Sequence, residues 1–483
     1  MSAAAHFPLQ IPGVTAGKGR QTEVTNPYSE ELLATVETAD AGAVEKALHT
    51  AYKLFRDRDN WLPIPQRLSI LEKALYAMQA QADELAYASA AEGGKPLIDS
   101  QVEMARCIDS IRHCIDTLRH QTSHPVPMGV NAASQHRMTM MQKEPIGVVV
   151  AISAFNHPLN LIAHQVGPAI AAGCPVIVKP AEATPLSCFR LVKIFHEAGL
   201  PAEWCQAFLT DGHEVSEQLA TDSRVAFLSF IGSAKVGWYL RSKLAPGTRC
   251  ALEHGGIAPV IVDKSANLDA IVPGLAKGSF YHAGQVCVSV QRIYADESIA
   301  ESLANKLADA GNRMSVGDPL SAKTAVGPLI RPSEVDRVDN WVQEAISQGA
   351  KCLSGAKTLP NNCYTPTVLL NPPKQAKVTQ HEVFGPVACI YPVKNLDDAI
   401  AAANDTDFAF QASVYSQDID QAMYAASRLD ASAVMINEHT AFRVDWMPFA
   451  GLKHSGHGVG GIAYSMEDMQ IDKMIVLTSK AIP

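Results

Sequence analysis

The sequence predicts an α/β protein with two parallel sheets, each covered by helices. Short apolar segments alternate with helical patterns between residues 145 and 252, and a second alternating series starts near Pro259 and continues to about Met435. Alternation of this kind is typical of parallel sheets whose strands are buried on both faces. With 483 residues, of which 47% are hydrophobic, the chain has ample apolar material for large cores.

The residues before the first alternating series are predicted to form short strands followed by long helices. Strand-like segments occur at residues 22–25 and 33–38. Two long amphipathic helices are expected at residues 65–93 and 98–121, because apolar residues recur there at helical spacing. Residues 138–141 then alternate in the way an exposed strand does.

The two alternating series supply the sheets. In the first, the expected strands are residues 146–152, 175–179, 204–209, 225–230 and 248–252, and the expected helices are residues 159–172, 185–198 and 234–244. The second opens with a strand at 260–262 and a helix at 268–281. A final apolar strand at 474–477 stands alone in the sequence, and we expect such a strand to pair with another subunit.

Composition and charge exclude several classes of function. The net charge of −9 is small for this length, and the charged residues are interspersed, so no basic patch favours nucleic acid or a membrane surface. The ten cysteines lack metal-ligand spacing, and residues 1–14 lack the features of a signal peptide. We therefore expect a soluble, cytoplasmic protein with reduced thiols, no metal, no nucleic-acid partner and no membrane partner.

Two predicted strand ends carry residues that suit a dinucleotide. The strand Val176-Ile177-Val178 leads into Lys179-Pro180-Ala181-Glu182, which places an ammonium and a carboxylate where a ribose can lie. The strand ending at Phe230 leads into Gly232-Ser233, a turn that opens a helix whose N-terminus favours phosphate. Neither is a G-x-G-x-x-G fingerprint, and each also fits an ordinary loop of an α/β protein.

Three polar side chains suggest chemistry at a carbonyl carbon. Cys287 follows a glycine-containing turn, and a thiolate there is a good nucleophile. Glu253 lies beside a glycine pair at a predicted strand end, where it can act as a general base for water, and Asn156 offers an amide donor for an oxyanion. The alternatives are a buried apolar cysteine, a surface acid and a turn residue.

The joint pattern resembles the aldehyde dehydrogenase superfamily over almost the whole chain. Seven motifs occur in the family's order: Phe155-Asn156-His157-Pro158, Val178-Lys179-Pro180-Ala181-Glu182, Phe230-Ile231-Gly232-Ser233, Leu252-Glu253-His254-Gly255-Gly256, Gly284-Gln285-Val286-Cys287, His381-Glu382-Val383-Phe384-Gly385-Pro386, and Pro448-Phe449-Ala450-Gly451 with Ser455-Gly456. Each motif is weak alone, but their order over the chain is hard to reach by chance.

The resemblance implies a mechanism and a cofactor. Cys287 matches the nucleophile, Asn156 the oxyanion donor and Glu253 the residue that activates water for thioester hydrolysis, so the product is expected to be a free acid. The cofactor is expected to be NAD, with NADP possible, because a carboxylate at Glu182 would repel the extra phosphate of NADP. The positions that match cofactor contacts are Lys179 and Glu182 for the adenosine ribose, Gly232 and Ser233 near the pyrophosphate, and Glu382 and Phe384 for the nicotinamide ribose.

The resemblance also implies a domain division. Residues 1–120 and 143–253 are expected to form a Rossmann-like NAD-binding domain, and residues 254–437 a catalytic domain that carries the nucleophile. Residues 121–142 and 460–483 are expected to form a small bridging β element through which the chain assembles into homodimers or homotetramers.

Departures from the family pattern concern the substrate. The Glu-His-Gly-Gly form and the run Asp445-Trp446-Met447-Pro448-Phe449 resemble the branch that acts on lactaldehyde, sulfolactaldehyde or phosphonoacetaldehyde. Arg106 and Arg443 are candidates to bind a substrate anion, and His157 and His439 are candidate polar groups of the substrate tunnel. Ordinary salt bridges for the arginines and a structural role for the histidines are the alternatives, and the neutral Val286 before Cys287 argues against an anionic substrate.

Three other functions remain open from the sequence. A catalytically idle, structural member of the fold would keep the architecture without turnover, and intact Cys287, Glu253 and Asn156 argue against it. A coenzyme A-acylating dehydrogenase tends to lack the acid found here at Glu253. A thiol hydrolase would use Cys287 without binding NAD.

Overall fold

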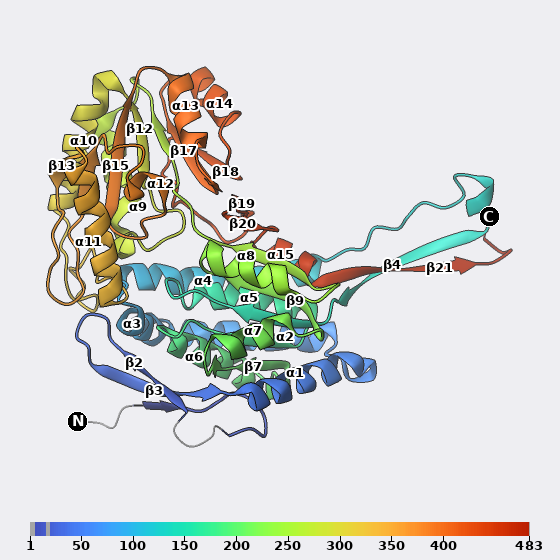
Figure 1. Ribbon diagram of the computed structural model, residues 1–483. Coiled ribbons are helices and arrows are strands. Elements are labelled where there is room, and N and C mark those ends of the chain that lie inside the picture. The colour runs from blue at the N-terminus through green and yellow to red at the C-terminus, as the bar shows by residue number, and fades with distance from the viewer. Residues whose placement is uncertain (1–4, 16–19, 483) are drawn as a thin grey trace.

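The computed structural model describes residues 5–15 and 20–482, and it confirms the predicted α/β class (Figure 1). Within these residues, a six-stranded sheet has the order β20-β10-β9-β5-β6-β7, and its strands are parallel except β20. The strands are β5 (Val148–Ile152), β6 (Val176–Lys179), β7 (Cys205–Ala207), β9 (Val225–Ile231), β10 (Arg249–Glu253) and β20 (Gly456–His457). All but β20 were expected from the sequence.

Helices cover both faces of this sheet because successive strand residues point to opposite sides. On one face, Val149 and Val178 pack with the helices α2 to α6 and α15, whereas Val148 and Ile177 pack on the other face with α1, α7 and α8. The helices are α1 (Ala41–Arg56), α2 (Ile64–Ala80), α3 (Ala82–Gly93), α4 (Leu97–His120), α5 (Asn160–Ala172), α6 (Pro185–Glu197), α7 (His213–Thr221), α8 (Ala234–Lys243) and α15 (Ile462–Asp468).

The expectation of one continuous helix over residues 65–93 was wrong. The structure has two helices there, and the break falls at Gln81, whose φ of −111° and ψ of 14° are not helical. Neither glycine nor proline marks the break, so the sequence pattern runs through it. α3 ends as predicted at the glycine pair, with Gly94 in a left-handed conformation.

The second sheet has seven strands within the described residues, in the order β13-β14-β15-β12-β11-β17-β18, and only β13 is antiparallel to its neighbour. The strands are β11 (Val260–Val262), β12 (Arg292–Asp296), β13 (Lys351–Ser354), β14 (Thr367–Leu370), β15 (Val387–Val393), β17 (Gln411–Tyr415) and β18 (Ala433–Ile436). The helices of this part are α9 (Leu268–Phe280), α10 (Glu297–Asn312), α11 (Pro332–Ser347), α12 (Lys377–Gln380), α13 (Leu396–Asn404) and α14 (Ile419–Ala426). The division predicted at residue 253 falls between β10, the last parallel strand of the first sheet along the chain, and β11, the first strand of the second sheet along the chain.

The C-terminal segment crosses between the two parts of the molecule. β19 (Leu452–Lys453) pairs with β16 (Phe408–Ala409), and β20 pairs with β10 at Leu252 and Glu253. Phe449, before β19, and Gly460, after β20, form an isolated antiparallel β-bridge. The sequence pattern did not predict these short pairings, although they fix the strand end that carries Glu253.

A two-stranded arm extends from the body (Figure 1). It consists of β4 (Arg137–Pro145) and β21 (Gln470–Thr478), which pair antiparallel over their whole length. The predicted strands at 138–141 and 474–477 are therefore too short. One edge of β21 is paired with β4 of the same chain, and the expected pairing of the terminal strand with another subunit stays a prediction. Apolar side chains of the arm remain exposed, among them Met140, Met474 and Val476.

A smaller sheet lies at the other end of the molecule. It contains β1 (Ala5–Phe7), β2 (Gln21–Thr25), β3 (Leu32–Ala39) and β8 (Leu209–Thr210), with β3 at its centre. The strand-like segments at 22–25 and 33–38 were predicted. In the part of the chain that the structure describes, every helix is too short or too polar to cross a lipid bilayer.

Candidate active site

One cavity of about 860 Å³ brings the predicted site residues together. It opens at the carboxyl ends of β5, β6, β9 and β10, which is where parallel sheets bind ligands. The predicted residues that line it are Arg106, Asn156, His157, Lys179, Glu182, Gly232, Ser233, Glu253, Cys287, Glu382, Phe384 and Arg443. Residues from distant parts of the sequence therefore converge on one space, as the motif pattern requires.

A strained turn presents Cys287 to this cavity. After α9 ends, three consecutive residues, His282, Ala283 and Gly284, adopt left-handed conformations with φ of 49°, 52° and 69°. Such conformations are costly for residues other than glycine, and they persist where the surroundings enforce them. Gly284 is required, since a Cβ there would collide with the carbonyl oxygen of Gly385.

The side chain of Gln285 holds this turn in place. Its Nε2 donates to the carbonyl oxygens of His282, at 3.2 Å, and Pro328, at 3.3 Å. Its Oε1 accepts from the backbone N–H of Ile330 at 3.0 Å. Because Gln285 is 1% exposed, these bonds are shielded from water. The turn that carries the thiol is thereby tied to the second sheet's loops.

Asn156 joins the end of β5 to the thiol-bearing turn. Its Nδ2 donates to the backbone oxygen of Gln285 at 2.9 Å, and the residue is 6% exposed. An amide group carries two N–H donors, so one bond to the protein leaves the second available to a ligand. Asn156 does lie in the bend between β5 and α5, which was the alternative interpretation, and its free N–H donor keeps the role of oxyanion donor as a prediction.

The carboxyl of Glu253 is enclosed at the end of β10, so the alternative of a surface acid does not hold. Burial raises its pKa to about 7, while the nearby guanidinium of Arg443 acts in the opposite direction. Gly460 faces this carboxyl, and a Cβ at Gly460 would overlap it. A carboxyl with a pKa near neutrality can exchange protons with water under physiological conditions.

The thiol of Cys287 shares this environment. Burial raises its pKa above the usual range, and the nearby carboxylates of Glu382 and Glu253 add to this effect. Arg443 lowers it, because a positive charge favours the thiolate. The reactivity of Cys287 therefore depends on the charges around it.

The groups expected to hold a dinucleotide lie at the other end of the cavity. Lys179 forms an ion pair with Glu182, and both line the space at the end of β6. Gly232 and Ser233 form the turn between β9 and α8, where a Cβ at Gly232 would press against the ring of Phe230. A helix N-terminus approached through a side-chain-free turn fits a phosphate group.

Glu382 and Phe384 close the cavity from the second sheet. Glu382 accepts from the backbone N–H of Gly256 at 3.0 Å, and burial raises its pKa to about 8. A Cβ at the neighbouring Gly255 would overlap this carboxyl. Phe384, in a left-handed conformation with φ of 47°, packs edge-on against Phe155 with ring centroids 5.8 Å apart. These residues fit the end of a dinucleotide nearest the thiol.

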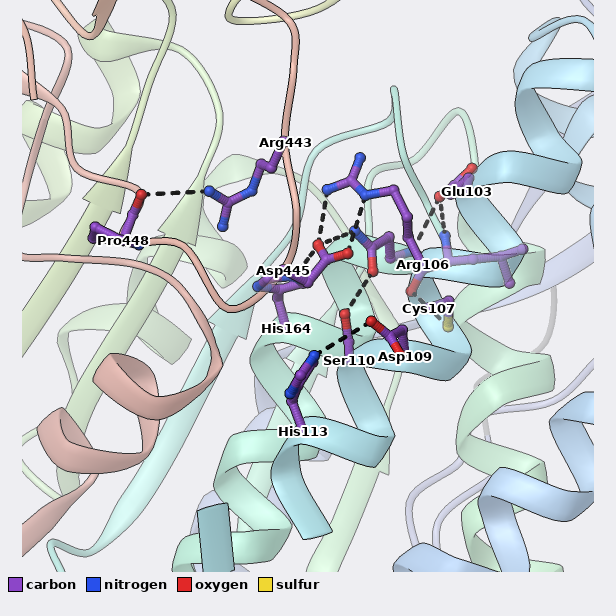
Figure 2. Close-up of polar contacts among 12 residues, drawn as sticks. Glu103, Arg106, Cys107, Asp109, Ser110, His113, His164, Arg443, Asp445 and Pro448 are labelled. Carbon is purple, nitrogen blue, oxygen red and sulfur yellow. Dashed lines mark hydrogen bonds and ion pairs between the residues drawn. The ribbon is translucent and has the colours of Figure 1, made fainter. Parts of the chain in front are cut away.

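Asp445 joins three side chains of α4 and α5 beside the cavity (Figure 2). It accepts hydrogen bonds from Arg106 Nε at 3.0 Å and Nη2 at 2.8 Å, from His164 Nε2 at 2.8 Å and from Asn160 Nδ2 at 3.1 Å. Burial alone would raise the pKa of Asp445, but the hydrogen bond from His164 and the charge of Arg106 hold it well below the usual range. The guanidinium of Arg106 is thus committed to an ion pair, which was the alternative interpretation of this residue.

Arg443 lies two residues before Asp445 and, unlike Arg106, forms no ion pair with it (Figure 2). Its guanidinium stacks on the ring of Phe449 at 4.0 Å and makes a long contact of 3.5 Å with the carbonyl oxygen of Pro448. Burial and the nearby Arg106 lower its pKa to about 10. A guanidinium carries five N–H donors, so Arg443 retains the capacity to bind an anion in the cavity that it lines.

The two candidate histidines differ. His157 lines the cavity and packs against His282 with ring centroids 6.0 Å apart, and burial holds its pKa well below the usual range, so it is neutral. His439 packs beside Gly278 of α9 and does not belong to the described cavity wall. The structure therefore favours a structural role for His439.

Several site residues were missed from the sequence. Asn160 and His164 are one helical turn apart on α5, so they share a face, but nothing in the sequence shows that this face meets Asp445. Lys95 and Glu103 are buried beside Asn156. The spacing of polar residues along one helix could have singled out Asn160 and His164, whereas their contact with Asp445 and the pair Lys95–Glu103 depend on the tertiary fold. Within residues 5–15 and 20–482, no group of three His, Cys, Asp or Glu side chains is arranged to hold a metal ion.

Comparison with known proteins agrees with this geometry. Residues 14–475 match the model of the aldehyde dehydrogenase family. The chain belongs to this family. A 3-sulfolactaldehyde dehydrogenase of Priestia aryabhattai is 35% identical over 477 residues, which cover 99% of each chain. The predicted family and the predicted sulfolactaldehyde-related branch are both confirmed.

Solved structures of the family have the same fold. Aldehyde dehydrogenase 21 from Physcomitrella patens, in complex with the reaction product succinate, superposes with a TM-score of 0.94 at 30% identity and covers 99% of each chain. The glyceraldehyde-3-phosphate dehydrogenase GapN from Methanocaldococcus jannaschii, complexed with NADP, superposes with a TM-score of 0.90 at 34% identity, covering 95% of this chain and 100% of that one. NAD(P) as the cofactor class agrees with these family members.

Proposed function

We propose that this protein oxidises a small anionic aldehyde to its carboxylic acid, with NAD as the preferred cofactor. The observation that carries the proposal is that the thiol of Cys287, the carboxyl of Glu253 and the amide of Asn156 line the same cavity as the dinucleotide-type residues. Each of these groups has a step to perform in aldehyde oxidation. Membership of the family supports the same reaction class.

In the first step, Cys287 Sγ attacks the aldehyde carbon. A C–S bond forms, the carbonyl electron pair moves to oxygen, and the thiol proton leaves to a neighbouring base. The amide of Asn156 and the backbone N–H of Cys287 stabilise the resulting oxyanion, since donors fixed in a buried site act more strongly than in water. NAD(P), when bound, supplies the acceptor for the two electrons and the hydrogen that leave the substrate carbon.

In the second step, Glu253 removes a proton from water. The hydroxide that forms attacks the carbonyl carbon of the thioester, which remains on Cys287 once the substrate carbon has lost its hydrogen and two electrons. The C–S bond breaks, the acid is released, and the Cys287 thiolate takes back the proton held by Glu253. The pKa of about 7 suits this task, because the carboxylate form is populated at neutral pH and remains basic enough to accept a proton. Glu253 therefore supports hydrolysis rather than transfer of the acyl group to coenzyme A.

For the cofactor, Lys179 and Glu182 would hold the adenosine ribose, the turn at Gly232 and Ser233 the pyrophosphate, and Glu382 with Phe384 the nicotinamide ribose. The ion pair between Lys179 and Glu182 keeps the carboxylate at the ribose end of the cavity. A carboxylate there repels a 2′-phosphate, which favours NAD over NADP.

For the substrate, Arg443 is the group proposed to bind the anion. Arg106 is held by Asp445, whereas Arg443 faces the cavity between Glu253 and the loop at Pro448. The relatives named above act on or bind molecules with a sulfonate, a carboxylate or a phosphate. A buried guanidinium is suited to two-point binding of each of these groups.

The test measures nicotinamide reduction with NAD and with NADP over sulfolactaldehyde, succinate semialdehyde, phosphonoacetaldehyde, lactaldehyde and propionaldehyde, with Cys287→Ala as the blank. We expect at least one anionic aldehyde to exceed propionaldehyde, and Arg443→Ala to raise the KM for it about tenfold or more with little change for propionaldehyde. Arg443→Lys is the matched control, because it keeps the positive charge but loses the two-point hydrogen bonding of a guanidinium. Its KM for the anionic aldehyde should lie between those of the wild type and Arg443→Ala. Equal losses for anionic and neutral aldehydes would contradict the substrate proposal.

The same assay separates the other candidate functions. A thiol hydrolase would cleave p-nitrophenyl acetate through Cys287 without binding NAD, and a structural protein would do neither. An acylating dehydrogenase would form acyl-coenzyme A only when coenzyme A is added. Each of these outcomes would replace the proposal with a defined alternative.

The arm of β4 and β21 supports a proposal about assembly. Its exposed apolar residues suit a contact with a second copy of the chain, so we propose a homodimer or homotetramer joined through this element.

A further inference from the structure

The backbone carbonyl of Asn156 is hydrogen-bonded to a buried ion pair that takes no part in the proposed attack by Cys287 or in the proposed hydrolysis. Lys95, in the turn between α3 and α4, pairs with Glu103 on α4, and each side chain is 1% exposed. Taking both charges out of water is unfavourable, and an apolar pair of the same volume is often as stable or more so. Packing alone therefore gives no reason for these two residues.

The pair contacts the segment that carries Asn156 at two points. Lys95 Nζ donates to the backbone oxygen of Asn156 at 3.1 Å. Glu103 Oε1 accepts from the backbone N–H groups of Leu159, at 2.8 Å, and Asn160, at 3.0 Å, where α5 begins. The remaining oxygen of Glu103 bonds Lys95 and lies 3.5 Å from Ser89 Oγ. Residues 156–160 are thus held at both ends by one ion pair.

We infer that Lys95 and Glu103 are positioning residues that fix the amide of Asn156 where the oxyanion forms. This inference rests on the proposed role of Asn156. With its backbone oxygen held by Lys95 and its Nδ2 held by Gln285, the amide has a fixed position before the aldehyde arrives. Preorganisation of this kind matters, since displacing a donor by about 1 Å can cost about a hundredfold in rate.

A double-mutant cycle tests the inference. With succinate semialdehyde and NAD, we expect Asn156→Ala to lower kcat/KM about a hundredfold, and Lys95→Met to lower it about tenfold, mainly through kcat. In the Asn156→Ala background, Lys95→Met should cost less than about twofold, because the group that it positions is gone. Equal losses in both backgrounds, or no loss from Lys95→Met, would overturn the inference.

Two measurements distinguish positioning from a general loss of structure. The rate of Cys287 alkylation by iodoacetamide needs no oxyanion donor and should stay within about twofold of wild type in Lys95→Met. Glu92→Gln is the matched control, since Glu92 is also fully buried and also accepts from two N–H groups at a helix start, those of Leu186 and Ser187, without contacting Asn156. Its loss of stability should leave kcat unchanged.

If Lys95→Met fails to fold, Lys95→Met with Glu103→Gln removes both charges and takes its place in the cycle. If the wild type reduces neither NAD nor NADP with any aldehyde while Cys287 is still alkylated, the proposed function fails and this inference fails with it. Additive losses in an active enzyme overturn the inference alone.

Discussion

Glu253 is the residue whose environment most directly sets its chemistry. It leaves the end of β10 into a space that Gly460 keeps free of any side chain, and the low-polarity surroundings raise its pKa to about 7. A carboxyl with an ordinary pKa would be too weak a base to activate water efficiently. The proposed role of Glu253 therefore depends on the glycine opposite as well as on the acid itself.

We expect Glu253→Gln to stop the reaction after the first turnover. The thioester would accumulate because an amide cannot remove a proton from water, so nicotinamide reduction should show a burst of about one equivalent followed by a rate lower by about a hundredfold. Mass spectrometry of the quenched protein should show the acyl group on Cys287. Steady turnover at the wild-type rate would contradict the role of Glu253.

The same carboxyl predicts a pH dependence. Only its ionised form accepts a proton, so the hydrolysis rate should rise with pH through about 7 and level off above it. Single-turnover hydrolysis of the acyl enzyme, followed from pH 5.5 to 8.5, measures this. An unchanged rate between pH 6 and 8 would assign the proton transfer to another group.

Sequence motifs were sufficient to find the residues that we propose to contact the reactants. Cys287, Glu253 and Asn156 each lie in a short pattern whose order along the chain is informative, and all three line the cavity. The residues that support them were not predictable in this way. Lys95 and Glu103 form no distinctive pattern, and the contact with Asn156 spans 61 positions of sequence.

At the scale of elements, Asp445 fixes the middle of the loop from Thr440 to Phe449, whose ends bond to Val288 and Gly460. Three side chains from α4 and α5 donate to this carboxylate, which is 2% exposed, so the loop that carries Arg443 is fixed to the helices behind it. Secondary-structure patterns predicted α4 and α5 but not this connection. The break at Gln81 and the short strand β20 were missed for a similar reason, since tertiary packing determines both.

We expect Asp445→Asn to lower the free energy of unfolding at pH 7 by about 3 kcal/mol, because it leaves Arg106 without its charged partner in a buried pair. The folded-state pKa of Asp445 lies below its unfolded value, so this stabilisation is present above the unfolded pKa near 4 and is lost as pH falls further. Urea unfolding at pH 7 and at pH 3 measures the difference, which should shrink at the lower pH.

Asp430→Asn is the matched control for this prediction. Asp430 pairs with Lys453 at 2.8 Å, but both side chains are well exposed, and such surface pairs contribute at most about 1 kcal/mol. A loss in Asp430→Asn equal to that in Asp445→Asn would show that burial is not the source of the effect.

At the scale of the whole molecule, the arm of β4 and β21 is the feature whose apolar surface is not covered by the rest of the described chain. β4 and β21 pair only with each other within the described residues and leave apolar side chains in solvent, with Val476 47% and Met474 48% exposed. A monomer rarely displays such a surface without a partner. The sequence indicated two strands in the correct places, but their full length and mutual pairing depend on register, which short patterns do not specify.

We expect Val476→Glu to shift the protein from an oligomer to a smaller species in size-exclusion chromatography with light scattering, because it places a charge in the proposed contact. Tyr76→Glu, on the exposed face of α2 with Tyr76 68% exposed, is the control and should leave the mass unchanged. A monomeric wild type, or an unchanged mass for Val476→Glu, would contradict assembly through the arm.

The crossing of the C-terminal segment has a consequence for biosynthesis. His254 Nδ1 contacts the backbone oxygen of His454, which lies 200 positions later in the sequence. Glu253 pairs with Gly456 of β20, so this edge of β10 is paired only when the C-terminal segment is present. Because a ribosome makes the chain from its N-terminus, the first sheet emerges and collapses long before these closing residues exist. A nascent chain can thus bury the core of its first sheet while the strand edge beside Glu253 and the wall at Gly460 are still missing, so the proposed active site is complete only after Gly460 has been added.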